Sequence, residues 1–296
     1  MSGVKEFNEC GGFFNCEVEK NKKNGNCGRK VEMEQKNLNE INTNEITREA
    51  WDAYQEEYAS IHVPDFEKWI NGYFDLDCYE PMISLIGDVK GLKLLDTCCS
   101  SDAWQTYSWH NLGAKVTACD IAPKAIEIVR KNAETMGFDI ECIVADMQKL
   151  EPIADGQFDI VFASYPIYVQ DIFEACRNWH RVLKKGGKLL WSADHPILDC
   201  IEEDDTGVHI TRDYNQPGTI WNESWGGTGA SENYCGLPWV ENIWRISDLL
   251  NAVCDAGFCI KKVHETYDGR FDSQNSGNEP QMKKLPADFF ILAVKQ

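Results

Sequence analysis

The sequence predicts an α/β protein built on a doubly wound, mostly parallel seven-stranded sheet with an antiparallel strand pair at its C-terminal end. Two observations support this fold class. Between residues 92 and 193, five short apolar runs alternate with three helical segments, as strands buried on both faces would. After residue 245, a helical segment precedes two more apolar runs with no crossover helix between them, which indicates antiparallel pairing.

The predicted elements follow from these periodicities. The five parallel strands are Leu92–Thr97, Lys115–Asp120, Ile140–Ala145, Phe158–Ala163 and Lys188–Ala193. The helices between them are Asp102–Leu112, Pro123–Met136 and Gln170–Leu183, with the run Lys184–Gly187 as a charged, glycine-capped helix end. The C-terminal part adds a helix at Ile246–Ala256 and strands at Phe258–Glu265 and Asp288–Lys295.

Two segments lie outside this alternation. Residues 1–45 are rich in Asn, Lys and Glu with little hydrophobic periodicity, so we expect a polar, disordered extension ahead of one domain at 46–296. A helical pattern of aromatic residues starts at Thr47 and includes Trp51, Tyr54 and Tyr58. Residues 195–244 break the alternation and are rich in Trp and Gly, which predicts a long irregular segment that forms a substrate-covering insertion.

Composition excludes several classes of protein. The formal net charge of −19, from 29 basic and 48 acidic residues, disfavours nucleic-acid binding and leaves a small molecule as the expected partner. The sequence shows neither a membrane-length apolar run nor a signal-peptide core, so we expect a cytoplasmic protein with no membrane partner. Of thirteen cysteines, several lie in apolar runs, and Cys10, Cys16 and Cys27 match no common zinc spacing, so no metal is expected. The oligomeric state stays open.

Acidic residues end the first three predicted strands. Ligands of an open parallel sheet bind beyond the carboxyl ends of its strands. Asp96 ends the first strand, and Asp120 ends the second, twenty positions beyond Ser100. An acid at that distance from the first turn is placed to accept both ribose hydroxyls of a nucleoside. Asp146 ends the third strand, where its carboxylate can accept a hydrogen bond from an adenine amino group.

These motifs resemble those of class I S-adenosylmethionine-dependent methyltransferases of the small-molecule type. The matching segments are Leu94–Ser100, Val116–Asp120, Val144–Met147, Phe158–Val161 and Arg181–Leu189, within a resemblance that covers roughly residues 47–296. The resemblance implies a Rossmann-like methyltransferase fold, S-adenosylmethionine as cofactor and methyl transfer to a small-molecule acceptor. It implies cofactor-binding roles for Tyr58, Asp96, Cys98, Ser100, Asp120, Ile121, Asp146, Met147 and Ser164.

The glycine loop of that family is degenerate in this sequence. Where the family reads Gly-x-Gly-x-Gly, this chain has Cys98, Ser100 and Asp102. Glycine there permits positive φ and close approach of a ligand, and the small Cys and Ser side chains still leave room. Asp102 is a candidate cap for the following helix.

Tyr165 and His195 are the candidate catalytic residues. They follow the fourth and fifth strands, where the resemblance places groups near the reacting methyl. A neutral His195 could accept a proton from the nucleophile, or it could simply close a turn. Tyr165 is followed by Pro166, unlike the motif of amino-directed DNA methyltransferases.

Two other functions remain open. The chain could use S-adenosylmethionine for non-methylating chemistry, such as cyclisation or cleavage of the cofactor, or bind it without catalysis. It could also be an NAD(P)-dependent oxidoreductase, although the Gly-x-Gly-x-x-Gly/Ala loop of that class would need Cys98, Ser100 and Ala103, of which only Ala103 fits. The acceptor and the atom methylated stay undetermined.

Overall fold

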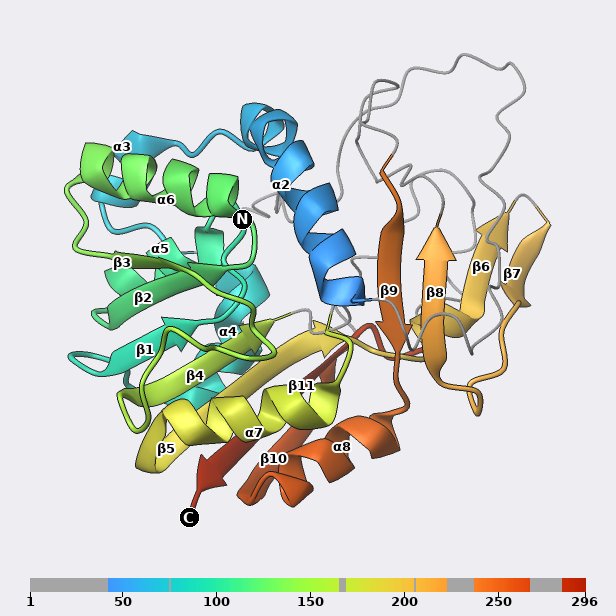
Figure 1. The fold of residues 1–296 in the computed structure, drawn as a ribbon. Helices are drawn as coiled ribbons and strands as arrows, with labels where there is room; N and C mark the ends of the chain where they lie inside the picture. The colour runs from blue at the N-terminus through green and yellow to red at the C-terminus, as the bar shows by residue number, and fades with distance from the viewer. Residues whose placement is uncertain (1–41, 75, 165–168, 205, 223–236, 267–283) are drawn as a thin grey trace, which may run out of the picture.

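The computed structural model describes residues 42–74, 76–164, 169–204, 206–222, 237–266 and 284–296. Seven strands form one twisted sheet in the order β10-β11-β5-β4-β1-β2-β3 (Figure 1). The five parallel strands are β1 (Lys93–Asp96), β2 (Lys115–Asp120), β3 (Glu141–Val144), β4 (Phe158–Ser164) and β5 (Leu183–Asp194). The antiparallel β11 (Asp288–Lys295) lies between β5 and β10 (Phe258–Thr266). The predicted fold class is confirmed.

Strand residues alternate between two cores, as side chains on a pleated sheet must. Leu94 and Leu190 contribute to one core, whereas Leu95, Leu189 and Trp191 point to the opposite face. The helices α7 (Ile172–Val182) and α8 (Ile246–Asp255) cover this second face. The other face is covered by α4 (Leu76–Ile86), α5 (Trp104–Asn111) and α6 (Pro123–Met136). Burial on both faces explains the nearly continuous apolar character of the inner strands.

The junction between α7 and β5 differs from the sequence prediction. The helix ends at Val182, and Leu183 is already extended and paired with Phe158. The expected glycine cap is therefore wrong, because Gly186 and Gly187 lie inside β5. Gly186 has φ +77°, and a Cβ on Gly187 would come within 2.8 Å of the Lys184 carbonyl oxygen, so the glycines permit a tight bend at the start of the strand.

The segment predicted as an irregular insertion contains paired strands. The strands β6 (Ile201–Asp204) and β7 (Gly207–Ile210) form one antiparallel pair after a short 3-10 turn, η2 (Leu198–Cys200). A second pair joins β8 (Gly218–Asn222) to β9 (Trp239–Ile243). The expectation of an irregular chain was wrong here, because the pairing of β8 with β9 joins residues too distant in sequence for a local pattern to reveal. Trp225 and Tyr234 lie outside the described residues.

An N-terminal helix, α2 (Thr43–Ile61), stands between the main sheet and the β8–β9 pair (Figure 1). It includes residues 43–45, which were predicted to belong to the polar extension. Asn42 caps it by accepting a hydrogen bond from the Glu45 amide at 3.3 Å. The short α3 (Phe66–Ile70) follows and packs near α6. The predicted disorder of residues 1–41 and the cysteines there lie outside the described residues.

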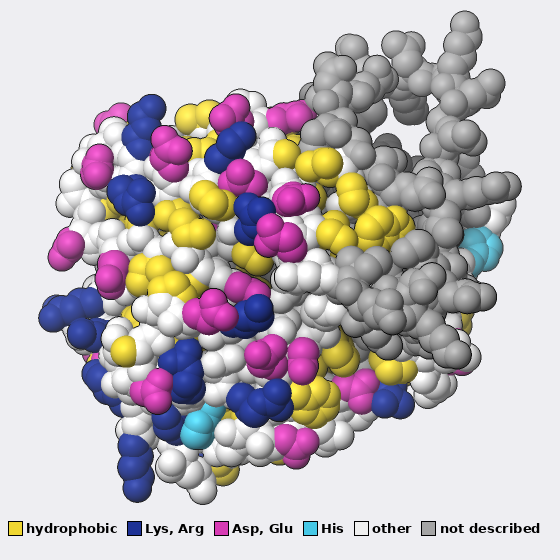
Figure 2. All heavy atoms as spheres, in the orientation of Figure 1, with side chains coloured by type: hydrophobic (Ala, Val, Ile, Leu, Met, Phe, Trp, Pro, Cys, Tyr) yellow, Lys and Arg dark blue, Asp and Glu magenta, His cyan; other side chains and the backbone are white. Residues whose placement is uncertain are grey.

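The described surface carries both signs of charge. On the face shown in Figure 2, Lys and Arg side chains are interspersed with Asp and Glu over α6, β3 and α7. Among the described helices, none is both long and apolar enough to cross a membrane.

Candidate functional site

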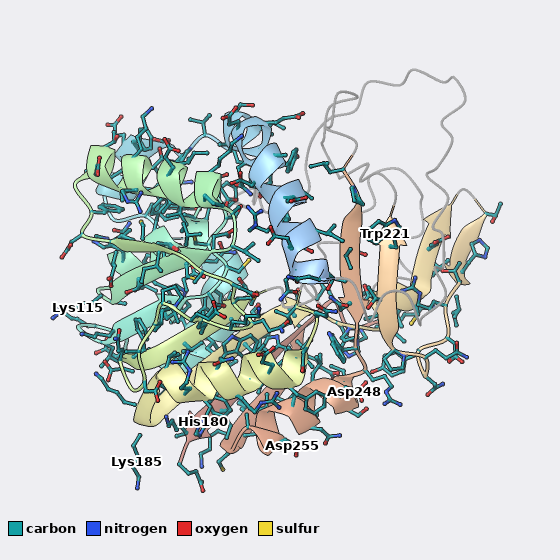
Figure 3. All side chains as sticks on the ribbon, viewed as in Figure 1. Lys115, His180, Lys185, Trp221, Asp248 and Asp255 are labelled. Atoms are coloured by element: carbon teal, nitrogen blue, oxygen red, sulfur yellow. The ribbon has the colours of Figure 1, made fainter. Side chains whose placement is uncertain are left out.

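A cavity lies at the carboxyl ends of β1, β2 and β3, with about 530 Å³ of empty space that is partly open to solvent. Its walls come from five parts of the chain that are distant in sequence. The lining residues are Asn44, Thr47, Trp51, Gln55, Thr97, Cys98, Ser100, Asp120, Ile121, Asp146, Met147 and Val169. Its position matches the rule that ligands of open parallel sheets bind beyond the carboxyl ends of the strands. In Figure 3, Lys115 at the start of β2 marks the opposite edge of the sheet.

Six of the predicted cofactor-binding residues lie together in this cavity. They are Cys98, Ser100, Asp120, Ile121, Asp146 and Met147. Three other predicted residues are not among those that line it. Asp96 braces the loop beneath, Ser164 ends β4 beside Ser192, and Tyr58 contacts Asp102. Tyr165 lies outside the described residues.

The loop after β1 contains two non-glycine residues with a left-handed backbone, one of them at a position where the family has glycine. Ser100 has φ +55° and Ala103 has φ +48°, both in the left-handed region that normally favours glycine. This conformation points the Ser100 amide at Asp120, whose Oδ2 accepts its hydrogen bond at 2.9 Å. Left-handed backbone at a non-glycine residue costs about 1–2 kcal/mol, so the surrounding contacts must hold the loop in place.

Asp102 does not cap α5, so this prediction was wrong. The N-cap position is Ala103, which makes no side-chain cap hydrogen bond. The Asp102 carboxylate instead accepts a hydrogen bond from the Tyr58 hydroxyl at 3.2 Å, tying the loop to α2. Burial raises the pKa of Asp102 to about 7.

Asp120 is held rigidly at the end of β2. Its Oδ1 accepts from the Ala122 amide and its Oδ2 from the Ser100 amide, each at 2.9 Å. Burial raises its pKa to about 6, an effect that outweighs the two amide hydrogen bonds. Each carboxylate oxygen has a second lone pair, so both can still accept a hydroxyl from a ligand.

Buried carboxyl groups are the main ionisable groups at the site. Asp96 accepts from the Thr106 hydroxyl at 2.7 Å and weakly from the Cys98 amide at 3.4 Å, yet burial raises its pKa to about 7. Burial likewise raises the pKa of Asp146. None of the described lining residues is Lys, Arg or His. A cationic ligand would stabilise the ionised form of these buried carboxyl groups, whereas an anionic ligand would be repelled by them.

Asp146 joins the third strand to α2. Its Oδ1 accepts from the Gln148 amide at 2.8 Å, and its Oδ2 accepts from the Asn44 side-chain amide at 2.9 Å. The Asn44 carbonyl oxygen accepts in turn from the Gln170 amide at 3.2 Å. Asn44 therefore links α2 to the segments that follow β3 and precede α7.

One face of α2 closes the cavity. Asn44, Thr47, Trp51 and Gln55 are spaced three and four residues apart, which places them on a single helical face. Six lining residues were not predicted as site residues: Asn44, Thr47, Trp51, Gln55, Thr97 and Val169. Trp51 belongs to the predicted aromatic helix, and extending its helical spacing in both directions would have identified the other three on α2. Thr97 lies within the motif segment Leu94–Ser100, whereas Val169 had no sequence signal.

His195 lies outside the cavity lining and closes the turn after β5. Its Nδ1 accepts from the Ile197 amide, so the hydrogen is on Nε2, which donates to Glu265 Oε1; both distances are 3.1 Å. Burial lowers its pKa, against the opposing effect of Glu265. In this arrangement neither ring nitrogen has a lone pair available to accept a proton.

Comparisons with known proteins agree with this geometry. Residues 95–191 match the family model described as a methyltransferase domain. Demethylmenaquinone methyltransferase of Lactococcus lactis is 29% identical over 123 residues, which are 40% of this chain and 48% of that protein. The chain spans half or less of the length of the first curated relatives it matches.

Solved structures share the fold at low identity. An S-adenosylmethionine-dependent methyltransferase of Mesorhizobium loti superposes with a TM-score of 0.58 at 22% identity, covering 76% of this chain and 100% of that one. The cyclase SpnF superposes with a TM-score of 0.56 at 14% identity, covering 86% of this chain and 97% of that one. Residues 95–191 therefore match a methyltransferase domain, and the chain shares the fold of solved S-adenosylmethionine-dependent methyltransferases.

Proposed function

We propose that the chain binds S-adenosylmethionine in this cavity and transfers its methyl group to a small-molecule acceptor. The observation that carries the proposal is the buried Asp120 carboxylate, which two backbone amides hold at the cavity wall. Its oxygens are placed to accept the two ribose hydroxyls. Asp146, at the end of the adjacent strand, is placed to accept from the adenine amino group.

The charge of the cavity supports this ligand over a dinucleotide. S-adenosylmethionine carries a positive sulfonium and a positive ammonium group, and Asp120 and Asp146 both line the cavity. The pyrophosphate of NAD(P) would bring negative charge close to these carboxylates, with no basic residue among the described lining residues to offset it. The cavity therefore favours a methyltransferase over an NAD(P)-dependent oxidoreductase.

The buried Ser100 hydroxyl also indicates that the cavity suits a polar ligand. Ser100 lines the cavity, and its buried Oγ has no hydrogen-bond partner among the described residues. Buried hydroxyls are normally paired, so a polar ligand that supplies the partner suits this wall.

Alignment and exclusion of water would supply most of the catalysis. When bound, S-adenosylmethionine supplies an activated methyl group with a good leaving group, so displacement needs no protein nucleophile. Asp120 and Asp146 would orient the nucleoside, and α2 would shield it from water behind Trp51. A general base is required only for a nucleophile that arrives protonated.

The catalytic role of Tyr165 stays a prediction, whereas for His195 we propose a structural role. Because both ring nitrogens of His195 are engaged, we propose that it stabilises the turn after β5 rather than accepting a proton.

The β8–β9 pair supports the predicted substrate-covering role of residues 195–244. This pair lies beside α2, and Figure 3 shows the position of Trp221 on β8. We propose that the acceptor enters from this side. The matched curated proteins include methyltransferases named for demethylmenaquinone and ubiquinone biosynthesis, so quinone precursors are reasonable first acceptors to test. The absence of a nucleic-acid partner and the cytoplasmic location stay predictions from the sequence.

Thermal unfolding with added ligands tests the proposal directly. S-adenosylmethionine and S-adenosylhomocysteine should raise the melting temperature, whereas NAD should not. At a hundredfold excess over the dissociation constant, linkage predicts about 2.7 kcal/mol of stabilisation. Mass spectrometry after incubation with candidate acceptors should then find a methylated product and an equal amount of S-adenosylhomocysteine. Equal stabilisation by NAD would refute the assignment.

Non-methylating chemistry is the second candidate function. SpnF is named as a cyclase and shares this fold, so the fold does not require methyl transfer. The same mass spectra decide between the two functions. Cleaved cofactor, or a rearranged acceptor with intact cofactor, would favour this alternative.

A further inference from the structure

Three contacts fix the path of α2 across the edge of the sheet. Near its start, Asn44 donates to Asp146 after β3. In its middle, Asp52 accepts from the amide of Lys124 at 2.8 Å and so caps α6, which follows β2. Near its end, Tyr58 donates to Asp102 in the loop after β1.

Since β1, β2 and β3 are neighbours in that order, α2 crosses their ends from β3 to β1. The inner face of α2 therefore follows the cavity from one end to the other. Thr47 lies one turn after Asn44, at the β3 end, and Gln55 lies one turn before Tyr58, at the β1 end. Trp51 stands between them, and all three line the cavity. At about 1.5 Å per residue, Thr47 and Gln55 are roughly 12 Å apart along the helix.

Buried polar atoms without partners among the described residues lie at both ends of the cavity: Thr47 Oγ1 at the β3 end, and Gln55 Oε1 and Ser100 Oγ at the β1 end. Gln55 is 1% exposed, and its Oε1 has no hydrogen-bond partner among the described residues. The buried Ser100 Oγ, on the loop after β1, also has no hydrogen-bond partner among the described residues. Buried polar groups are normally paired, and leaving them unpaired is unfavourable. Both residues line the cavity, so a bound ligand can supply the partners.

We infer, resting on the proposed function, that Gln55 binds the amino-acid end of S-adenosylmethionine. Asp146 and Asp120 assign the adenine and the ribose to the β3 and β2 sides, so the amino-acid end must extend towards β1. Gln55 Oε1 accepts a hydrogen bond from the ammonium group there. Ser100 Oγ lies on the facing loop, where its hydroxyl can donate to the carboxylate. Gln55 is thus a specificity-determining residue on the covering helix.

Two ligands that differ only at this end test the inference. S-adenosylhomocysteine carries the amino-acid group, whereas 5′-methylthioadenosine has a methyl in its place. By calorimetry, Gln55→Met should weaken S-adenosylhomocysteine binding roughly ten- to a hundredfold, because a hydrogen bond to a charged group is lost. Binding of 5′-methylthioadenosine should stay within about twofold, since Met keeps the length of the side chain without its amide.

Two further variants complete the experiment. Gln55→Glu keeps an acceptor oxygen, so it should retain the preference for S-adenosylhomocysteine even if Gln55→Met is poorly folded. Thr47→Val alters the opposite end of the same helical face and should leave the ratio of the two affinities unchanged. A ratio unchanged by Gln55→Met, or lost equally in Thr47→Val, would overturn the role of Gln55 while leaving the proposed function intact. Failure of the wild-type protein to bind either ligand would overturn both.

Discussion

Replacing Asp120 with Asn removes the charge at the centre of the proposed ribose site while keeping the size of the side chain. In the wild-type protein, each Asp120 oxygen accepts one backbone amide and retains a lone pair for a ribose hydroxyl. Hydrogen bonds to a charged group contribute about 1.5–3 kcal/mol, against about 0.5–1.5 kcal/mol for neutral pairs. The variant should therefore lose about 1–3 kcal/mol of binding free energy, or roughly five- to 150-fold in affinity.

The fold should tolerate this change because two effects on stability oppose each other. Burial raises the pKa of Asp120 from 3.8 to about 6, so keeping it ionised in the ligand-free protein costs about 3 kcal/mol at neutral pH. Asn removes that cost, but its NH₂ group then faces the amide of Ser100 or Ala122, which loses its acceptor. An unpaired buried donor costs about 1–3 kcal/mol, so the net change in stability should be small.

Calorimetry with S-adenosylhomocysteine, alongside thermal unfolding of the ligand-free protein, measures both quantities. Asp159→Asn is the matched control. Asp159 lies at the start of β4, at the opposite edge of the sheet, where it accepts from the Lys93 amide and pairs with Lys184 at 2.7 Å. The control should bind the ligand as the wild-type protein does. An affinity of Asp120→Asn within twofold of the wild type would refute the assignment of Asp120 to the ribose.

Three more substitutions test the surrounding structure. The raised pKa of Asp102, about 7, means that its contribution to stability is present below about pH 4 and is lost as the pH rises through 7. Asp102→Asn should therefore gain stability relative to the wild type between pH 5 and pH 8 in urea unfolding, and a constant difference would contradict this. Asn44→Ala should lose about 1–3 kcal/mol, with faster amide exchange in α2, because it removes the hydrogen bonds that the Asn44 side chain makes with Asp146 and with the Gln170 amide. Uniformly faster exchange would argue against the link. His195→Ala should lose about 1–3 kcal/mol through the Ile197 amide, with cofactor affinity unchanged. A hundredfold loss of turnover without loss of stability would instead support His195 as a base.

Much of the fold could be predicted because its local signals are strong. The bounds of β2, α6 and β11 agree with prediction to the residue, since strands buried on both faces read as continuous apolar runs and Pro123 begins its helix. The spacing from Ser100 to Asp120 placed both residues in one site, because the carboxyl ends of neighbouring parallel strands meet at one edge.

Other features depended on contacts between residues far apart in the chain. Asn44 reaches Asp146 across 102 positions, and His195 reaches Glu265 across 70, so neither partner could be inferred from local pattern. The positive φ of Ser100 could not be predicted from the sequence either, because serine adopts that conformation only where the surrounding structure imposes it. Hydrophobic periodicity in the sequence determined which segments form the sheet and which acids end its strands. The tertiary structure alone decided which face of α2 closes the cavity and which hydrogen bonds His195 makes, because both depend on distant segments meeting only in the folded chain.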